Sequence, residues 1–145
     1  RSDPETLRVY VRFLIEAGMY SVAGTLLLQR LKKNWEPSLV LIYSQIPVEP
    51  AAKQLQQLED WSEIHKEGKE LKLAKAYYAA RIGLWGVAKT EAEKLFAIEP
   101  TPALYHLLAK IAAGTGEAQK AASYRENGLS LALERLDARE DISAR

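Results

Sequence analysis

The sequence predicts an all-α fold built from consecutive pairs of helices. Apolar residues recur at spacings of three and four, the helical period, along most of its 145 residues. Gly18, Gly83 and Gly116 interrupt this pattern, and each lies five residues before an alanine. Since glycine tolerates the backbone conformation that ends a helix, these positions predict turns between helices. We expect helix-dominated circular dichroism and no strand ladder.

The first predicted unit covers residues 4–33. Asp3 and Pro4 form a typical pair for the cap and first turn of a helix. Gly18 then divides the unit into two helices. The apolar stripe of the first helix consists of Leu7, Tyr10, Val11 and Leu14, and that of the second of Val22, Ala23, Leu26 and Leu27.

Two later segments repeat the scheme. Residues 73–100 contain Gly83 at their turn, and Pro100 closes the unit. The last unit begins with Thr101 and Pro102, again a cap followed by a first-turn proline. Its first helix has the stripe Tyr105, Leu108, Ala109 and Ala112, and its second helix has Ala118, Ala121, Ala122 and Leu129.

The spacing of the alanines after the turns indicates the type of repeat. Ala88 and Ala121 lie close to one period of about 34 residues apart, and Ala23 and Ala88 lie close to two. Paired helices with this period predict a tetratricopeptide-like right-handed superhelix of about four antiparallel pairs. We expect Ala88 and Ala121 to be buried where helices cross. Val11, Ala76 and Ala109 precede the glycines by seven residues and are also expected at close helix contacts.

The second pair is predicted to be degenerate. Residues 37–66 contain a short apolar helix from Leu39 to Ile46 and two prolines around a turn, but no turn glycine. The following helix has the stripe Ala51, Leu55, Leu58 and Trp61. The predicted repeat domain spans residues 1–136, and residues 137–145 are expected to be a frayed or disordered tail.

Composition restricts the function classes. Hydrophobic residues make up 48% of the chain and charged residues 27%, which is typical of a globular protein. A net charge of +1 gives no reason to expect nucleic-acid binding. The absence of cysteine excludes disulfides and thiolate metal sites. No apolar run approaches the roughly 18 residues that predict a membrane span, and the start "RSDPET" indicates a fragment of a longer protein.

Catalytic motifs are missing from the sequence. Its two histidines, His65 and His106, lie far apart, and neither HExxH nor GxSxG occurs. Gly83-Leu84-Trp85-Gly86 lacks the Gly-Lys-Ser/Thr pattern of a phosphate loop, so we interpret it as a helix–turn–helix junction. We expect no enzyme activity, no catalytic or metal-binding residues and no cofactor. His65 is interpreted as part of a solvated helix end.

The three tryptophans could form a cofactor-stacking set, but packing explains them better. Trp61 and Trp85 lie on apolar stripes and are expected in the core. Trp35 lies between units, where we expect it to pack at the junction.

Stacked helix pairs usually bind partners on the concave surface lined by the first helix of each pair. The residues predicted to face this groove are Arg8, Arg12, Tyr43, Leu73, Tyr77, Arg81, His106 and Lys110. Arginine and tyrosine are enriched among interface anchors. This set predicts a mildly basic, aromatic groove suited to an acidic or carboxylate-ended protein segment. The alternative is that these are ordinary solvated side chains on a helical surface.

The C-terminal half also resembles a known family. Leu84, Trp85, Gly86 and Ala88 are followed by Pro100, Thr101, Tyr105, Leu108 and Ala109, and then by Tyr124, Arg125, Gly128 and Leu129. This succession resembles the C-terminal region of the HemY family of proteobacterial inner-membrane proteins. Upstream, "KNWEPSLVLIYSQI" and "QLQQLEDWSEIHKE" are similar to the family's middle segment, so the resemblance covers about residues 4–133. Val87 departs from the family, in which a basic residue is expected.

The resemblance implies a role but no catalytic residue. HemY-like proteins have a repeat domain anchored in the inner membrane and are associated with late haem synthesis. It implies a scaffold that organises haem-synthesis enzymes, with this domain on the cytoplasmic side and membrane contact only through segments outside this sequence. One alternative is direct haem or porphyrin binding, with contacts from Tyr77, Arg81 and His106. Another is an unrelated tetratricopeptide adaptor.

Overall fold

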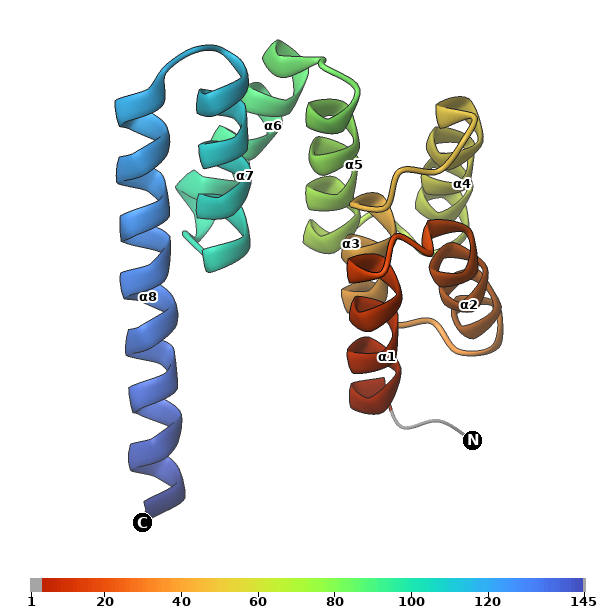
Figure 1. The fold of residues 1–145 in the computed structure, drawn as a ribbon, viewed down its shortest axis with the longest axis horizontal. Coiled ribbons are helices and arrows are strands. Elements are labelled where there is room, and N and C mark those ends of the chain that lie inside the picture. The colour runs from red at the N-terminus through yellow and green to blue at the C-terminus, as the bar shows by residue number, and fades with distance from the viewer. Residues whose placement is uncertain (1–3, 145) are drawn as a thin grey trace. The chain divides into compact units, whose positions relative to one another are not determined.

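The computed structural model describes residues 4–144, and over that range the chain is helical without any strand. The helices are α1 (Pro4–Glu16), α2 (Tyr20–Lys33), α3 (Pro37–Ser44), α4 (Ala51–Ile64), α5 (Lys69–Arg81), α6 (Trp85–Ile98), α7 (Pro102–Gly114) and α8 (Ala118–Ala144) (Figure 1). The predicted all-α class is therefore confirmed. The short α3 and the loop after it agree with the short helix and turn predicted there, and the right-handed superhelix of about four antiparallel pairs stays a prediction.

Two compact units make up the chain, where the sequence suggested one domain. The first ends at Ile82 and contains α1–α5, and the second begins at Gly83 and contains α6–α8. In the first unit α2 packs on α1 and α3, and α5 packs on α3 and α4. In the second unit α7 packs on both α6 and α8.

The predicted turns are confirmed. Gly18, Gly83 and Gly116 have φ angles of 76°, 83° and 81°, a left-handed conformation that residues with a Cβ rarely adopt. The cap at the start of α7 is also confirmed, because the backbone N–H of Leu104 donates to Thr101 Oγ1 at 3.2 Å. The cap predicted at Asp3 lies outside the described residues.

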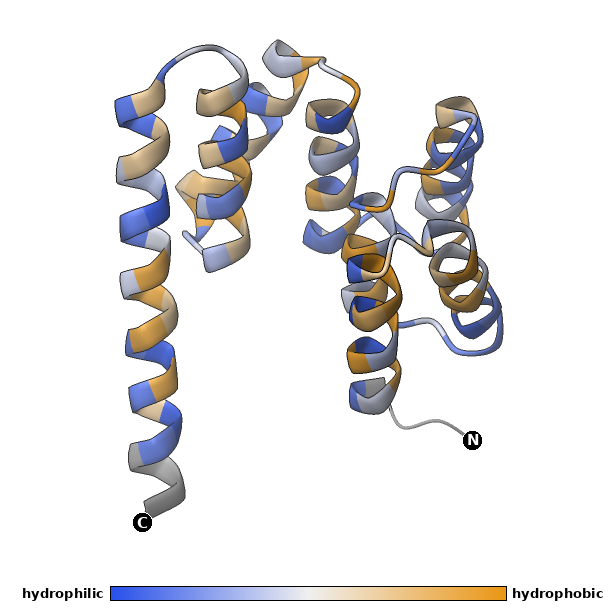
Figure 2. Ribbon diagram, in the orientation of Figure 1, coloured by the Kyte–Doolittle hydropathy of each residue, from blue (hydrophilic) through white to orange (hydrophobic). Residues whose placement is uncertain are grey.

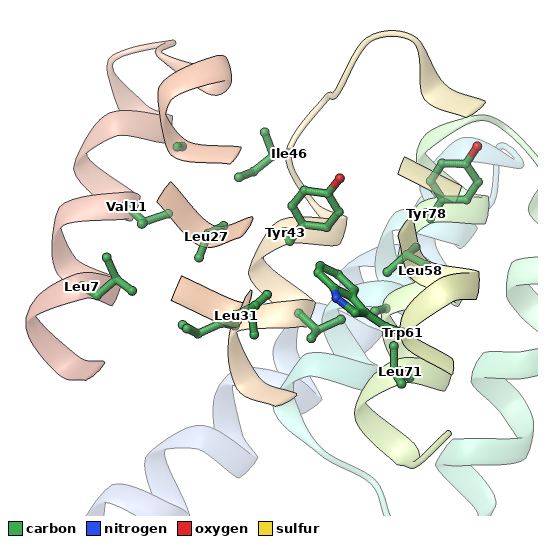
Figure 3. Close-up of a cluster of buried hydrophobic side chains, with 14 of the residues drawn as sticks. Leu7, Val11, Leu27, Leu31, Tyr43, Ile46, Leu58, Trp61, Leu71 and Tyr78 are labelled. Atoms are coloured by element: carbon green, nitrogen blue, oxygen red, sulfur yellow. The ribbon is translucent and has the colours of Figure 1, made fainter. Parts of the chain in front are cut away.

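The core of the first unit joins residues from all five helices. Val11, Leu27, Leu39 and Leu58 are fully buried, and Trp61 packs with them (Figure 3). The Trp61 ring lies edge-on to Tyr43 and to Trp35, with centroid distances of 5.3 and 5.6 Å. Trp61 is thus a core residue and Trp35 packs at the junction, as predicted.

Small residues set the close helix contacts of the second unit. Ala88 and Ala121 are buried, as predicted, and Ala23 in the first unit is buried too. Val11, Ala76 and Ala109 are also buried. At Gly128 on α8, an added Cβ would lie 2.7 Å from the Cβ of Tyr105 on α7. Only glycine lets these two helices approach so closely.

Several residues of the predicted apolar stripes are exposed instead of buried. The buried face of these helices is narrower than the apolar pattern suggested. Tyr10, Val22, Leu55 and Leu129 are all exposed. In α1 Val9 and Phe13 are also exposed, at 64% and 65%. Figure 2 shows that hydrophobic and hydrophilic positions alternate along this helix.

Helix α8 continues to Ala144, and residues 137–140 are exposed helical positions. The sequence after Leu136 contains neither glycine nor proline to stop the helix. The frayed tail expected at residues 137–145 stays a prediction.

Candidate functional site

The eight residues predicted to face one groove belong to both units. Six lie in the first unit, on α1, α3 and α5, and the other two lie on α7 in the second. The structure brings them together in smaller groups, each of which has its own environment.

The two arginines of α1 differ in what they contact. Arg8 Nη1 donates to Glu5 Oε2 at 3.0 Å, and Arg8 Nη2 donates to Ser38 Oγ at 3.1 Å. Arg8 therefore ties α1 to the start of α3, and its buried Nε has no hydrogen-bond partner among the described residues. Arg12 is exposed and forms no ion pair within residues 5–140.

Tyr43 and Tyr77 correct the prediction of an aromatic groove, since their side chains are only 2% and 4% exposed. Burial raises the pKa of both phenols, and Arg81 partly offsets this for Tyr43. Leu73 is half-buried. Tyr43 was expected to add to the groove from the degenerate second pair, yet its ring packs against Trp61 in the core.

Arg81 belongs to a buried hydrogen-bond network. Its Nη2 donates to Gln54 Oε1, and its guanidinium lies 5.6 Å from the centre of the Tyr78 ring. Gln54 is fully buried and donates from Nε2 to Tyr43 O at 2.7 Å and to Ile46 O at 2.9 Å. The Tyr43 carbonyl also accepts from the backbone N–H of Ile46 at 3.1 Å. Both carbonyls lie where α3 ends, so Gln54 supplies a donor that a further helical turn would otherwise provide. Arg81 is therefore a structural residue, although its buried Nε lacks a partner among the described residues.

The two groove residues of the second unit lie beside a third basic residue. His106 and Lys110 occupy one exposed face of α7, four residues apart. Burial lowers the pKa of His106, and the positive charges of Lys110 and then Arg125 lower it further. Arg125 comes from α8, so the cluster spans the packed α7–α8 pair. We call His106, Lys110 and Arg125 the basic cluster.

Two members of the basic cluster, Lys110 and Arg125, form no ion pair within the described part of the chain. The ion pairs there involve other lysines and arginines, such as Lys120 with Glu117 and Arg135 with Glu99. An anionic group can therefore pair with Lys110 and Arg125 without first breaking an ion pair of these two side chains.

Sequence reasoning missed the role of Arg125 and of His65. Arg125 is part of the C-terminal motif, but its distance from His106 in sequence hid their proximity. His65 is not simply solvated, because its ring stacks on Trp35 with a centroid distance of 3.7 Å and an interplanar angle of 4°. Its place one residue after the last turn of α4 gave no signal of this contact.

The first unit also contains a hollow of about 510 Å³. One wall is a face of α2 with the preceding turn, and the other is Tyr43 with the loop that follows α3. The sequence interpretation assigned no site here, although the glycine at position 24, inside a predicted helix, was a visible anomaly.

The described residues contain no group of three or more histidine, cysteine, aspartate or glutamate residues arranged to hold a metal ion. None of the helices in the range 4–144 combines the length and apolar character needed to cross a bilayer.

Comparison with protein-family models, with curated proteins and with solved structures gave no match. The resemblance to the HemY family therefore stays a prediction from the motifs quoted above.

Proposed function

We propose that this chain is a helical binding module that holds an acidic segment of a partner protein. The basic cluster is the observation that supports this function. It places three basic side chains, from two packed helices, on one surface of the second unit. A carboxylate-rich segment would relieve their mutual repulsion, and arginine and lysine would donate charge-assisted hydrogen bonds to it.

The chemistry of the cluster also favours a flexible or extended partner segment. His106 and Lys110 are exposed on α7, and Arg125 is exposed on α8. Exposed charges contribute little individually, about 0.2–1 kcal/mol per pair. Useful affinity therefore requires several carboxylates that contact the cluster together.

The HemY-like motifs support a narrower form of the proposal. In that form the module lies at the inner membrane of a longer protein, on its cytoplasmic side, and its partners are enzymes of late haem synthesis. The proposal is for binding rather than catalysis.

The test measures binding of a fluorescein-labelled peptide in which glutamate alternates with alanine. The double variant Lys110→Glu, Arg125→Glu should weaken binding roughly tenfold, because each reversal replaces an attraction by a repulsion. Lys89→Glu with Lys94→Glu is the matched control, because both lysines are exposed on α6 and unpaired within the described residues. The control should keep most of the affinity.

Salt dependence supplies a second criterion. Binding should strengthen as ionic strength is lowered, because exposed charges are screened over about 8 Å at physiological salt. Equal losses in the two double variants would mean that the peptide responds only to total charge, and the proposed site would then be wrong.

A further inference from the structure

Gly24 lies at the floor of the hollow in the first unit, and internal packing does not explain why this residue is a glycine. Gly24 lies in the interior of α2, has no positive φ, and is buried. A Cβ built on it would meet no atom within 4 Å. Glycine is therefore required neither by backbone conformation nor by a close helix contact, although it weakens a helix interior relative to alanine.

One face of α2 forms this floor. Its residues recur at helical spacing on the side next to the core residues Ala23 and Leu27, and Leu28 also packs against the core. They are Tyr20, Ser21, Gly24, Thr25 and Leu28. The volume of about 510 Å³ falls within the range of ligand sites. Glycine at the centre of this face leaves room for a ligand to approach the helix backbone.

The polar groups that line the hollow are free to bind. The hydroxyls of Tyr20, Ser21 and Thr25 make no hydrogen bond to another described side chain or carbonyl. Glu49 is the one charged residue of the lining, and it forms no ion pair within the described part of the chain. A carboxylate beside hydroxyl acceptors and an aromatic ring suits an ammonium or guanidinium group.

Arg81 determines which side of the hollow suits a cation. Its positive charge acts on the phenol of Tyr43, so the wall at Tyr43 is the less favourable side. Glu49, on the loop before α4, is the favourable side. The apolar Leu28 and Val48 would contact the methylene groups of a long basic side chain.

We propose that this hollow binds a lysine side chain of a partner protein, with Glu49 as its counter-ion and Gly24 as the open floor. The inference rests on the proposed function in that the ligand comes from a protein. The lysine site lies in the first unit and binds a positive charge, whereas the basic cluster lies in the second unit and binds negative charges. The two proposals can therefore fail separately.

The probe is a short acetylated and amidated peptide with one lysine between two leucines, titrated into the ¹⁵N-labelled chain. Saturable shifts are expected for the amides of Ser21, Gly24 and Thr25. The same peptide with acetyl-lysine should bind roughly tenfold more weakly, since it lacks the charge that pairs with Glu49.

Four variants test the assigned roles. Gly24→Leu should fill the floor and lower affinity about tenfold, and Glu49→Gln should do the same by removing the counter-ion. Glu59→Gln is the control for charge, because Glu59 is exposed on α4, unpaired within the described residues and outside the hollow. Gly24→Ala should raise the melting temperature by about 2 °C, because it improves helix propensity without a clash.

Equal binding of the lysine and acetyl-lysine peptides, or unchanged binding by Glu49→Gln, would overturn the proposal. Butylamine that binds as tightly as the peptide would overturn the assignment to a protein side chain and indicate a small amine. Failure of the lysine peptide leaves the acidic-peptide measurement on the second unit unaffected.

Discussion

The close approach of α7 and α8 can be tested by adding one methyl group to α8. Gly128→Ala would place a Cβ 2.7 Å from the Cβ of Tyr105 and 3.4 Å from its Cγ. The first distance is too short for two carbon atoms, and a Cβ cannot move unless the backbone moves with it. Inserting a methylene into a packed contact typically costs about 1–3 kcal/mol.

Helix propensity acts in the opposite direction. Alanine is favoured over glycine by about 0.8–1.0 kcal/mol in a helix interior. The net effect of Gly128→Ala is therefore a loss of roughly 0–2 kcal/mol. Gly86→Ala provides the reference, because a Cβ at Gly86 meets nothing within 4 Å and the residue also lies in a helix of the second unit.

The quantity to measure is the difference in unfolding free energy between the two alanine variants. It should be about 1–3 kcal/mol, with Gly86→Ala the more stable. Urea unfolding followed by circular dichroism measures it, and both substitutions affect the same unit. In melting temperature, 1 kcal/mol corresponds to about 2–4 °C for a chain of this size. If both variants were stabilised equally, the contact at Tyr105 would not be as close as described.

The remaining predictions concern the core, the buried network, the pH dependence and haem. Ala88→Leu should cost roughly 1–3 kcal/mol, because Ala88 is fully buried, and an unchanged melting temperature would contradict its place in the packing. Gln54→Leu should cost about 2–4 kcal/mol in urea unfolding by removing the amide donor to the Tyr43 and Ile46 carbonyls and the acceptor of Arg81, whereas Gln56→Leu on the exposed side of α4 should be nearly neutral. The pKa of His106 is lower in the folded chain than in the unfolded chain, so His106 is protonated in the unfolded chain first as pH falls. The free energy of unfolding should therefore decrease as pH drops below about 6.5. His106→Gln should flatten that slope. Hemin titration should give no saturable Soret shift that depends on His106, and a stoichiometric shift lost in His106→Ala would favour the haem-binding alternative.

Local sequence signals predicted the helices well because each has a local physical cause. Thr101 can cap a helix because its hydroxyl reaches the N–H of Leu104, three residues away. Gly18, Gly83 and Gly116 mark turns because their backbone requires positive φ. Such causes act within a few residues, so the pattern of residues was enough to place the helix ends.

The candidate sites depended on contacts between distant residues, and these could not be predicted in the same way. Helical periodicity gave no sign that Tyr43 packs against Trp61, or that the buried Gln54 donates to the carbonyls at the end of α3. Arg125 reaches the surroundings of His106 only through the packing of α7 on α8. Gly24 was visible in the sequence, but its role required knowledge of the open space above it.

The central claim is that the basic cluster binds acidic protein segments, and the pKa of His106 tests it most directly. Nuclear magnetic resonance should find this pKa below about 6.5 in the free chain, because burial, Lys110 and Arg125 all disfavour the imidazolium. Adding a peptide in which glutamate alternates with alanine should raise it, since nearby carboxylates stabilise the charged form. The rise should saturate with peptide and shrink with added salt. A pKa of His106 that stays the same at saturating peptide would contradict the account.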